Sequence, residues 1–430
     1  MNVSVLLLGS QNVSHSRLGP PASLPARCTR VPVLLALAAV CVLAACQSGS
    51  GTATLPPTPR ASLAQTPSAS PSVSPSPIST VRPSPSPSTP HGIFTLTDSM
   101  KEERVQHAAA MLHDGRVLVV GSDVRAEIYD PSSGTFTTTG SLSHDRTEPV
   151  AVTLHDGRVL VVGAADNVDA KDTGAEIYDP SSGKFTAVRP LIDRSGAAVA
   201  LLSDGRVLVA GGGDMRPGHC LTASAELFDP ASNKFTLTGS LSAARAGATA
   251  SLLQDGRVLI AGGGPCGDPQ SGTATTFATA EIYDPQSGRF SRTGDMTVAR
   301  EQHTATVLPD GRVLMAGGFS YVTGLYLSSA EIFDPGTGTF TPTGSMTAVR
   351  GDAIAVLLRN GKVLVAGGAN DYTDLGVATA ELFDPSTGTF SATGSMHSPR
   401  STFTATLLGD GNVLVTGSGV DSISCELYWP

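Results

Sequence analysis

The chain has 430 residues, of which 40% are hydrophobic and 5% aromatic, and its formal net charge is −9. Its basic residues are dispersed along the sequence, so it lacks the clustered positive charge that neutralises nucleic-acid phosphates. Composition and charge therefore argue against a nucleic-acid partner, and we expect a monomer.

Residues 1–45 have the character of an export signal. An apolar run from Val31 to Ala45 follows two arginines, and no acidic residue precedes Cys46. The run is too short to cross a membrane comfortably as a helix and is typical of a signal peptide. It ends in Leu-Ala-Ala-Cys, which resembles the lipobox of bacterial lipoproteins and implies cleavage before Cys46 and lipid attachment to that residue. The alternative is an ordinary signal peptide followed by an incidental cysteine.

A tract rich in proline, serine and threonine occupies residues 46–91. It has almost no large apolar side chains, so it cannot bury a core. This composition favours an extended polyproline-II conformation with a reach of at most about 140 Å, at ~3.1 Å per residue. We expect a disordered tether that holds the following domain outside the bacterial cell membrane, to which the protein is anchored by its lipid.

Residues 92–430 contain a sevenfold repeat. A variant of Asp-Gly-Arg-Val-Leu-Val is followed each time by a variant of Ala-Glu-Ile-Tyr-Asp-Pro, with a mean period of about 49 residues. The first motif begins at Asp114, Asp156, Asp204, Asp255, Asp310, Asn360 and Asp410. This period is typical of one propeller blade per repeat.

Each repeat divides into four short strands, as residues 235–284 illustrate. A small, apolar first strand from Gly247 to Leu253 ends at an Asp-Gly pair, which favours a tight turn. A second strand, rich in β-branched residues, ends in a glycine doublet, and a third strand from Ala280 to Tyr283 stops at Asp-Pro. Small residues suit the innermost strand because the blades converge on the axis.

The two ends of the repeat region complement each other. The last repeat stops after its third strand, whereas Gly92 to Met100 matches the fourth-strand stretch of other repeats without three strands before it. We predict that residues 92–98 complete the blade built by residues 401–429, which closes a seven-bladed ring without an exposed sheet edge.

This region resembles the kelch-repeat and galactose-oxidase-like β-propellers. The glycine doublets and the Tyr-Asp-Pro or Phe-Asp-Pro turns carry the resemblance, although phenylalanine stands where the family often has tryptophan, and Trp429 is the only tryptophan. The resemblance implies an all-β, seven-bladed kelch-type propeller. Such propellers serve enzymes, adhesins and protein-binding scaffolds alike, so the fold implies no single activity.

The galactose-oxidase resemblance also raises the question of copper. That site needs two tyrosines, two histidines and a cysteine crosslinked to one tyrosine. In this chain four tyrosines occupy the periodic turn position, where Phe228, Phe333 and Phe383 substitute for tyrosine, and we interpret them as core residues. The histidines are either periodic or scattered among non-adjacent blades, so we predict neither a metal nor another cofactor.

Two charged residues recur in every repeat, an arginine before the first strand and a glutamate on the third. A ligand site usually breaks a repeat, so we expect these residues to form structural ion pairs that tie the blades together. The expected pairs include Arg245 with Glu281, Arg300 with Glu331, and Arg350 with Glu381.

Ligand-binding residues are expected where the repeats differ, in the loops between the second and third strands. In kelch-like propellers these loops share a face with the connections between blades and would surround the mouth of the central channel. Their aromatic and acidic side chains suit a carbohydrate or a peptide, and the alternative is that they are solvated loops. The candidates are Asp166, Asp169, Arg216, His219, Tyr321, Tyr326, Asp371, Tyr372 and Asp374.

The same loops contain two cysteines. Cys220 and Cys266 lie in equivalent loops of consecutive repeats, so a disulfide between them is geometrically plausible in an oxidising compartment. The alternative is two free thiols. Cys425 replaces a recurring alanine, and we expect it to be a small buried apolar residue.

Three classes of function fit these observations. The favoured hypothesis is a non-enzymatic, surface-exposed lipoprotein whose propeller binds a glycan or a protein. An enzyme, either similar to the kelch-type sugar mutarotases and epimerases or to galactose oxidase, is the second hypothesis, although no arginine and carboxylate pair stands out from the repeat. A structural envelope component is the third.

Overall fold

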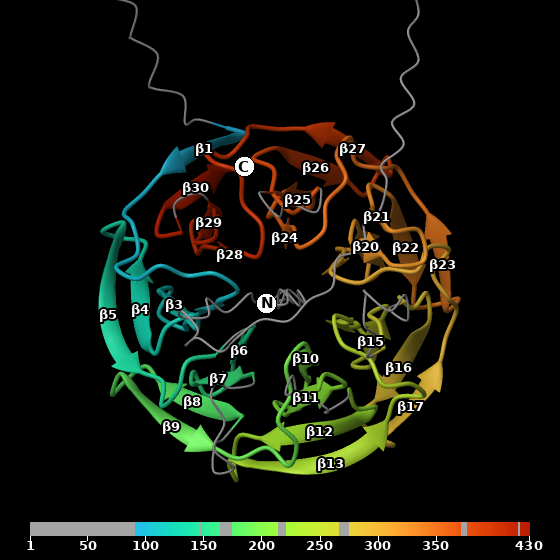
Figure 1. Ribbon diagram of the computed structural model, residues 1–430, viewed down its shortest axis with the longest axis horizontal. Helices are drawn as coiled ribbons and strands as arrows, with labels where there is room; N and C mark the ends of the chain where they lie inside the picture. Colours follow the sequence, from blue (N-terminus) through green and yellow to red (C-terminus); the bar gives the residue numbers. More distant parts are fainter. Residues whose placement is uncertain are drawn as a thin grey trace, which may run out of the picture. The chain divides into compact units, whose positions relative to one another are not determined.

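The computed structural model describes residues 91–146, 148–163, 174–213, 221–265, 275–370, 376–419 and 422–430. The described residues form seven four-stranded antiparallel sheets that surround a central axis as the blades of a propeller (Figure 1). The leader, Cys46 and the tether up to residue 90 lie outside the described residues. None of the described residues forms a helix with the length and hydrophobicity needed to cross a membrane.

The first four blades follow the chain in order. Blade 1 consists of β2 (Ala108–Met111), β3 (Val117–Val120), β4 (Arg125–Asp130) and β5 (Thr135–Ser141). Blade 2 consists of β6 (Val150–Thr153), β7 (Val159–Val162), β8 (Ala175–Asp179) and β9 (Lys184–Val188). Blade 3 consists of β10 (Ala198–Leu201), β11 (Val207–Ala210), β12 (Ser224–Asp229) and β13 (Lys234–Ser240). Blade 4 consists of β14 (Thr249–Leu252), β15 (Val258–Ala261), β16 (Ala280–Asp284) and β17 (Arg289–Arg292).

The last three blades add one hairpin and one strand from the other end of the propeller domain. Blade 5 consists of β18 (Thr304–Val307), β19 (Val313–Ala316), β22 (Ala330–Asp334) and β23 (Thr339–Pro342), with a hairpin of β20 (Phe319–Ser320) and β21 (Leu325–Tyr326) between its second and third strands. Blade 6 consists of β24 (Ile354–Leu357), β25 (Val363–Ala366), β26 (Ala380–Asp384) and β27 (Thr389–Ala392). Blade 7 consists of β28 (Thr404–Leu407), β29 (Val413–Thr416), β30 (Cys425–Trp429) and β1 (Ile93–Leu96).

The hydrophobic core lies between the blades. Each of seven clusters of buried side chains joins two neighbouring blades, so no blade buries its faces alone. Between blades 3 and 4, for example, Leu208 packs with Val258 and Tyr283. Across each blade, the ring of the third strand stacks at a tilt on a phenylalanine of the fourth, as in Tyr283 and Phe290 with centroids 4.8 Å apart.

The closure predicted from the sequence is confirmed. β1 pairs antiparallel with β30, with Phe94 opposite Tyr428, and the two rings lie 4.8 Å apart. The paired segment is Ile93–Leu96, shorter than the predicted residues 92–98. Phe94 is only 5% exposed, which explains why this strand belongs to the core of the ring and is not an appendage.

Candidate ligand-binding face

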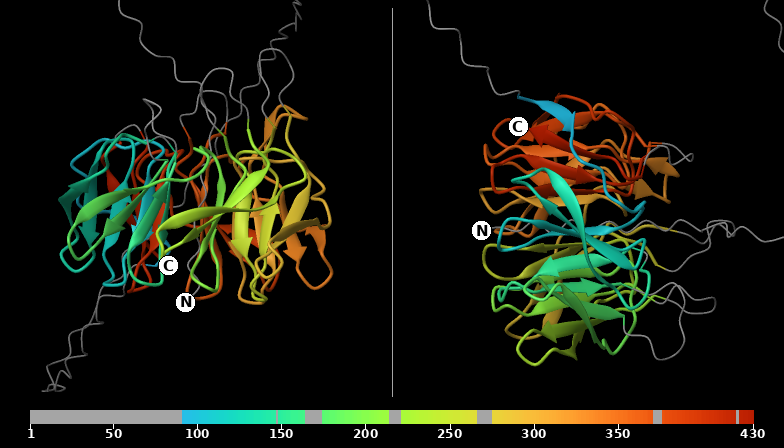
Figure 2. Two further views of the ribbon diagram at one scale, coloured as in Figure 1. Left: turned by 90° about the horizontal axis from the view of Figure 1, so that it is seen from below. Right: turned by 90° about the vertical axis from the view of Figure 1, so that its left-hand side faces the viewer.

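The propeller has two faces that differ in construction. One, here called the turn face, carries the Asp-Gly turns after the first strands and the Asp-Pro turns after the third. The other, here called the loop face, carries the second-to-third-strand loops and the connections between blades. Bridges between these two kinds of segment, such as Glu301 with Phe319 and Gly351 with Ala369, place them side by side. The side view in Figure 2 shows the β20–β21 hairpin rising from the loop face.

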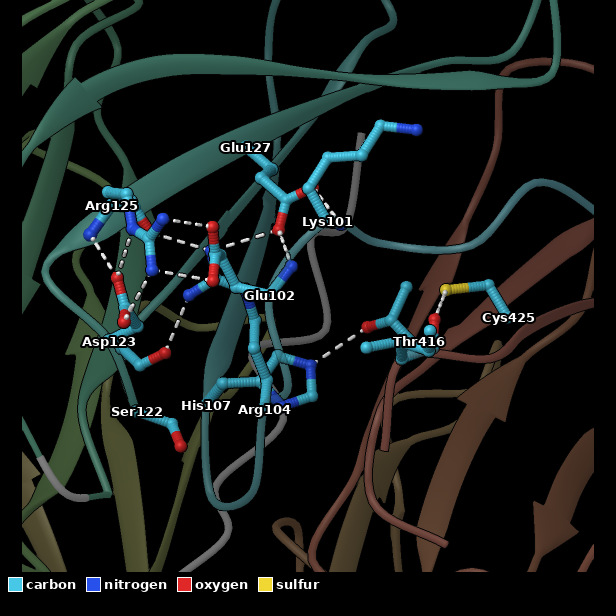
Figure 3. A network of polar contacts seen from close by, with 12 residues as sticks. Lys101, Glu102, Arg104, His107, Ser122, Asp123, Arg125, Glu127, Thr416 and Cys425 are labelled. Carbon is cyan, nitrogen blue, oxygen red and sulfur yellow. Dashed lines mark hydrogen bonds and ion pairs between the residues drawn. The ribbon is translucent and has the colours of Figure 1, made fainter. Parts of the chain in front are cut away.

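A layer of arginine and glutamate pairs lies beneath the loop face. All fourteen side chains belong to residues that are at most 2% exposed. The nitrogen to oxygen distances are 3.1 Å for Arg104–Glu127, 2.9 Å for Arg146–Glu176, 3.6 Å for Arg194–Glu226, 3.3 Å for Arg245–Glu281, 3.0 Å for Arg300–Glu331, 3.1 Å for Arg350–Glu381 and 3.0 Å for Arg400–Glu426. Figure 3 shows the pair of blade 1, where Glu127 also accepts a hydrogen bond from the backbone N–H of Lys101.

Each pair secures a connection to the blade that follows it. In blade 4, Arg245 donates to the carbonyl oxygens of Gly262 and Thr279, both at 3.0 Å, while Glu281 accepts from the backbone N–H of Ser242. Arg245 and Ser242 precede the blade, whereas Glu281 lies on its third strand, β16. The guanidinium thus donates to two buried carbonyl oxygens as well as to a carboxylate. These groups are engaged with one another inside the blade and do not face a ligand.

One pair is weaker than the others. Arg194 and Glu226 are 3.6 Å apart, and burial raises the pKa of the Glu226 carboxyl above its usual value, although Arg194 opposes that shift. Arg194 instead donates at 2.7 Å to the carbonyl oxygen of Gly211 and at 2.8 Å to the Ser224 hydroxyl. The arginine keeps its backbone partner in all seven blades, whereas its distance to the carboxylate varies.

A ring of seven residues surrounds the axis on the loop face. These residues, here called the axial ring, stand two positions after each repeating arginine: Gln106, Glu148, Gly196, Gly247, Gln302, Asp352 and Thr402. All seven have φ between 51° and 64°, a left-handed conformation that glycine adopts freely and other residues rarely adopt. Five side chains are therefore held where glycine would be less strained, a pattern that clusters at functional sites.

Hydrogen bonds between neighbouring blades hold the axial ring. The backbone N–H of Glu148 donates to the carbonyl oxygen of Gln106, and that of Asp352 donates to Gln302, at 3.1 and 3.0 Å. The amide of Gln106 also donates to the Glu148 carboxylate at 3.1 Å. The ring thus presents amide, carboxylate and hydroxyl groups from different blades at one end of the axis.

Aromatic side chains gather on the β20–β21 hairpin next to the axial ring. Phe319 is buried and contacts the edges of Tyr321 and Tyr326, with ring centroids 4.9 and 5.0 Å away. At the tip, Val322 and Leu325 are 66% and 62% exposed. The hairpin therefore combines a buried aromatic base with an exposed apolar tip.

The structure brings together two of the ligand-binding residues predicted from sequence, Tyr321 and Tyr326, through their common contact with Phe319. The other seven predicted residues lie outside the described residues, as do both cysteines of the predicted disulfide: Asp166, Asp169, Arg216, His219, Asp371, Tyr372, Asp374, Cys220 and Cys266. The axial ring was not predicted from the sequence, because ligand-binding residues were expected only in the second-to-third-strand loops. Its signal is the changing residue two positions after an unchanging arginine.

The described residues do not fit the copper site of the oxidases. Three of the periodic tyrosines, Tyr129, Tyr283 and Tyr428, are fully buried, and their hydroxyls bond to threonines of the preceding blade. His107 and His303 are buried as well, and burial lowers the pKa of each to about 3, so both are neutral. In the described part of the chain, no three His, Cys, Asp or Glu side chains form a set that could hold a metal ion.

The expected burial of Cys425 is present in the structure. Its side chain is fully buried, and burial raises the pKa of the thiol to about 12. The sulfur contacts the carbonyl oxygen of Ile423 at 3.5 Å. This thiol behaves as a small apolar group.

Comparisons with known proteins agree with this architecture. A family model of the kelch motif matches residues 302–347, and no curated protein matches the chain. Among solved structures, a fungal alcohol oxidase of the AA5 family, determined in complex with copper, is similar with a TM-score of 0.63 and 21% sequence identity over 79% of this chain and 76% of that chain. The predicted kelch-type propeller fold is confirmed, and at this sequence identity the likeness to the oxidase concerns the fold alone.

Proposed function

We propose that the protein is an exported, lipid-anchored, non-enzymatic binding module whose loop face holds a glycan. One observation carries the proposal: five polar side chains of the axial ring occupy left-handed conformations, although glycine stands at the two equivalent positions Gly196 and Gly247. A left-handed conformation costs a non-glycine residue on the order of 1 kcal/mol or more. Side chains kept at that cost are best explained by a contact with a ligand.

The chemistry of the face favours a sugar. Amides, carboxylates and hydroxyls such as those of Gln302, Asp352 and Thr402 match the donors and acceptors of sugar hydroxyls. Tyr321 and Tyr326 supply flat apolar surfaces at the edge of the same face. A small-molecule site usually combines aromatic rings with a small number of precisely placed polar groups.

The non-enzymatic part of the proposal is supported by how the repeated charges are used. The seven arginines donate to backbone carbonyls and glutamates inside the blades, so they are not available for acid–base work on a ligand. The periodic tyrosines are engaged with threonines of the neighbouring blade.

A protein ligand is the second candidate, because the hairpin tip exposes Val322 and Leu325. Their exposed fractions, 66% and 62%, are the highest among the large apolar side chains of the described residues. Exposed apolar groups of this kind occur at sites of protein contact.

The binding proposal is tested with an array of glycans and peptidoglycan fragments, probed with the full chain. Tyr321→Ala and Gln302→Ala should each weaken binding at least fivefold at unchanged thermal stability. The matched control is Arg289→Ala, which removes an exposed side chain on the turn face. Binding that survives both loop-face changes, or is lost in the control, would contradict the proposal.

The anchor is tested separately. Cys46→Ala should abolish incorporation of radiolabelled palmitate and move the protein from the membrane fraction to the soluble fraction. Cys41→Ala, within the leader, is the control and should leave both readouts unchanged. Unaltered labelling of the Cys46 variant would favour an ordinary signal peptide.

A further inference from the structure

Glu301 is a buried carboxyl that the repeat does not explain. It lies between the repeating Arg300 and the axial-ring residue Gln302, and it is 8% exposed. In the other repeats this position is uncharged, being Val105, Thr147, Ser195, Ala246, Gly351 and Ser401. The Glu301 side chain forms no hydrogen bond and no ion pair with the described residues. A buried carboxyl without a partner is costly, so its presence calls for an explanation.

The carboxyl lies at the boundary between blades 4 and 5. The Glu301 backbone is fixed to β20 by two hydrogen bonds with Phe319, at 3.0 and 2.8 Å. Its side chain reaches towards Gly264 of blade 4, where a methyl group would lie 2.8 Å from the Glu301 Oε2 and 2.5 Å from the carbonyl oxygen of Thr275. The carboxyl oxygen and the carbonyl oxygen therefore both pack against the Gly264 backbone and lie close to each other.

Both groups at this position are hydrogen-bond acceptors. In the described part of the chain no N–H or O–H donates to the Thr275 carbonyl oxygen. Next to it, the hydroxyls of Thr276 and Ser320 lie 3.5 Å apart across the same blade boundary, and both residues are buried. A ligand group that donates several hydrogen bonds and carries positive charge would satisfy this set of oxygens.

We propose that Glu301 and the Thr275 carbonyl form a subsite for an ammonium group, so that the bound glycan contains an amino sugar whose nitrogen is not acylated. This inference rests on the function proposed above. The two charged residues of the axial ring, Glu148 and Asp352, are also acidic, and the nearby Arg300 is paired with Glu331. The axial ring and Glu301 thus offer the ammonium group acidic side chains and no basic one.

Burial also means that the Glu301 carboxyl should lose a proton when the ligand binds. Desolvation raises its pKa to about 8, so the free protein holds the carboxyl protonated at neutral pH. Arrival of an ammonium group favours the carboxylate, and the proton then leaves to solvent. An acetylated nitrogen carries no charge and cannot drive this step.

The experiment compares two probes by calorimetry at pH 6.5 with the full chain: a glucosamine hexamer and an N-acetylglucosamine hexamer. A charge-assisted hydrogen bond contributes about 1.5–3 kcal/mol, so the glucosamine hexamer should bind at least about tenfold more tightly. Its binding should also release close to one proton, measured in two buffers of different ionisation enthalpy. Glu301→Gln should remove both the preference and the proton release, whereas Glu103→Gln, at an exposed carboxylate on the connection before blade 1, should keep both.

The outcomes separate the two proposals. Equal binding of both hexamers by the wild type, or an unchanged preference in Glu301→Gln, would overturn the ammonium subsite while the glycan-binding function stands. Lack of binding to either hexamer and to any arrayed glycan, with binding of lysine-rich peptides instead, would overturn both. The proton release is measured on the wild type, so the inference is testable even if the glutamine variant fails to fold.

Discussion

The turn face and the loop face are built from the same seven repeats, yet they treat their polar groups in opposite ways. On the turn face the Asp-Gly turn satisfies itself: the Asp255 carboxylate accepts the Arg257 backbone N–H at 3.0 Å and its guanidinium at 2.8 Å. The Asp-Pro turn repeats the device, with Asp284 accepting the Gln286 N–H at 2.9 Å.

On the loop face, constancy and variation lie in separate layers. The buried arginine and glutamate pairs repeat in every blade and hold the connections, whereas the axial ring and Glu301 directly above them change from blade to blade. The invariant buried pairs therefore hold in place a layer of residues that differ between blades. This difference indicates that, in a repeat protein, candidate functional residues are the variable ones that invariant neighbours position.

The largest effect is expected from the loss of one buried arginine and glutamate pair. Arg245→Ala removes the partner of the buried Glu281 and of two backbone carbonyls, and should lower the free energy of unfolding by roughly 3–5 kcal/mol. Arg257→Ala, in the exposed pair with Asp255 on the turn face, should cost about 0.5 kcal/mol. Urea denaturation of both variants measures the contrast, and equal effects would erase the distinction between the faces.

The second effect depends on pH. The folded-state pKa of Glu301, about 8, lies above its ordinary value of 4.5, so the folded protein binds the extra proton between these values and its stability falls as pH rises through that window. Glu301→Gln does not titrate and should match the wild type at pH 4. At pH 9 it should be more stable by on the order of 3 kcal/mol. Thermal unfolding of both proteins from pH 4 to 9 measures this, and parallel profiles would contradict it.

The third prediction concerns a change on the loop face that should affect stability and binding in opposite directions. Gln302→Gly relieves a left-handed glutamine with a φ of 54° and should hold or raise the free energy of unfolding, by up to about 1 kcal/mol. The same change should weaken glycan binding, because it removes a polar group of the axial ring. Loss of stability together with unchanged binding would show that the side chain serves the fold.

The smallest effect is expected in the core between blades. Tyr283→Phe removes the hydroxyl that lies 2.8 Å from the Thr238 hydroxyl, and should cost only about 0.5–1 kcal/mol. Phenylalanine already occupies the equivalent positions 228, 333 and 383. Urea denaturation measures the change, and a loss as large as that of Arg245→Ala would mean that the tyrosine has a role beyond packing.

The sequence predicted the fold in detail because every blade repeats the same local signals. Asp-Gly and Asp-Pro turns, small inner strands and glycine doublets recur seven times, so errors in one repeat are corrected by the others. Even the pairing of β1 with β30 followed from counting strands, since Gly92 to Met100 matches a fourth strand and the last repeat lacks one.

The candidate site was predicted only in part. Tyr321 and Tyr326 stood out because their loop departs from the repeat. The left-handed conformation of residues such as Glu148 and Asp352 is invisible in the sequence, because glycine is the usual signal for positive φ and these residues are not glycine. Glu301 was not predicted as a site residue, because the sequence does not show that its carboxyl lies next to Gly264 and Thr275 of the neighbouring blade.

The pairing of β1 with β30 also determines when the ring can form. Ile93 pairs with Trp429, and the backbone N–H of Gly92 donates to the carbonyl oxygen of Trp429 at 2.6 Å. During synthesis, therefore, β1 can pair only after β30 has been made, and the seventh blade is completed only after the other six have been translated. Because residues 92 and 429 lie together, a circular permutant joined there and opened between two other blades should assemble the same ring in a different order.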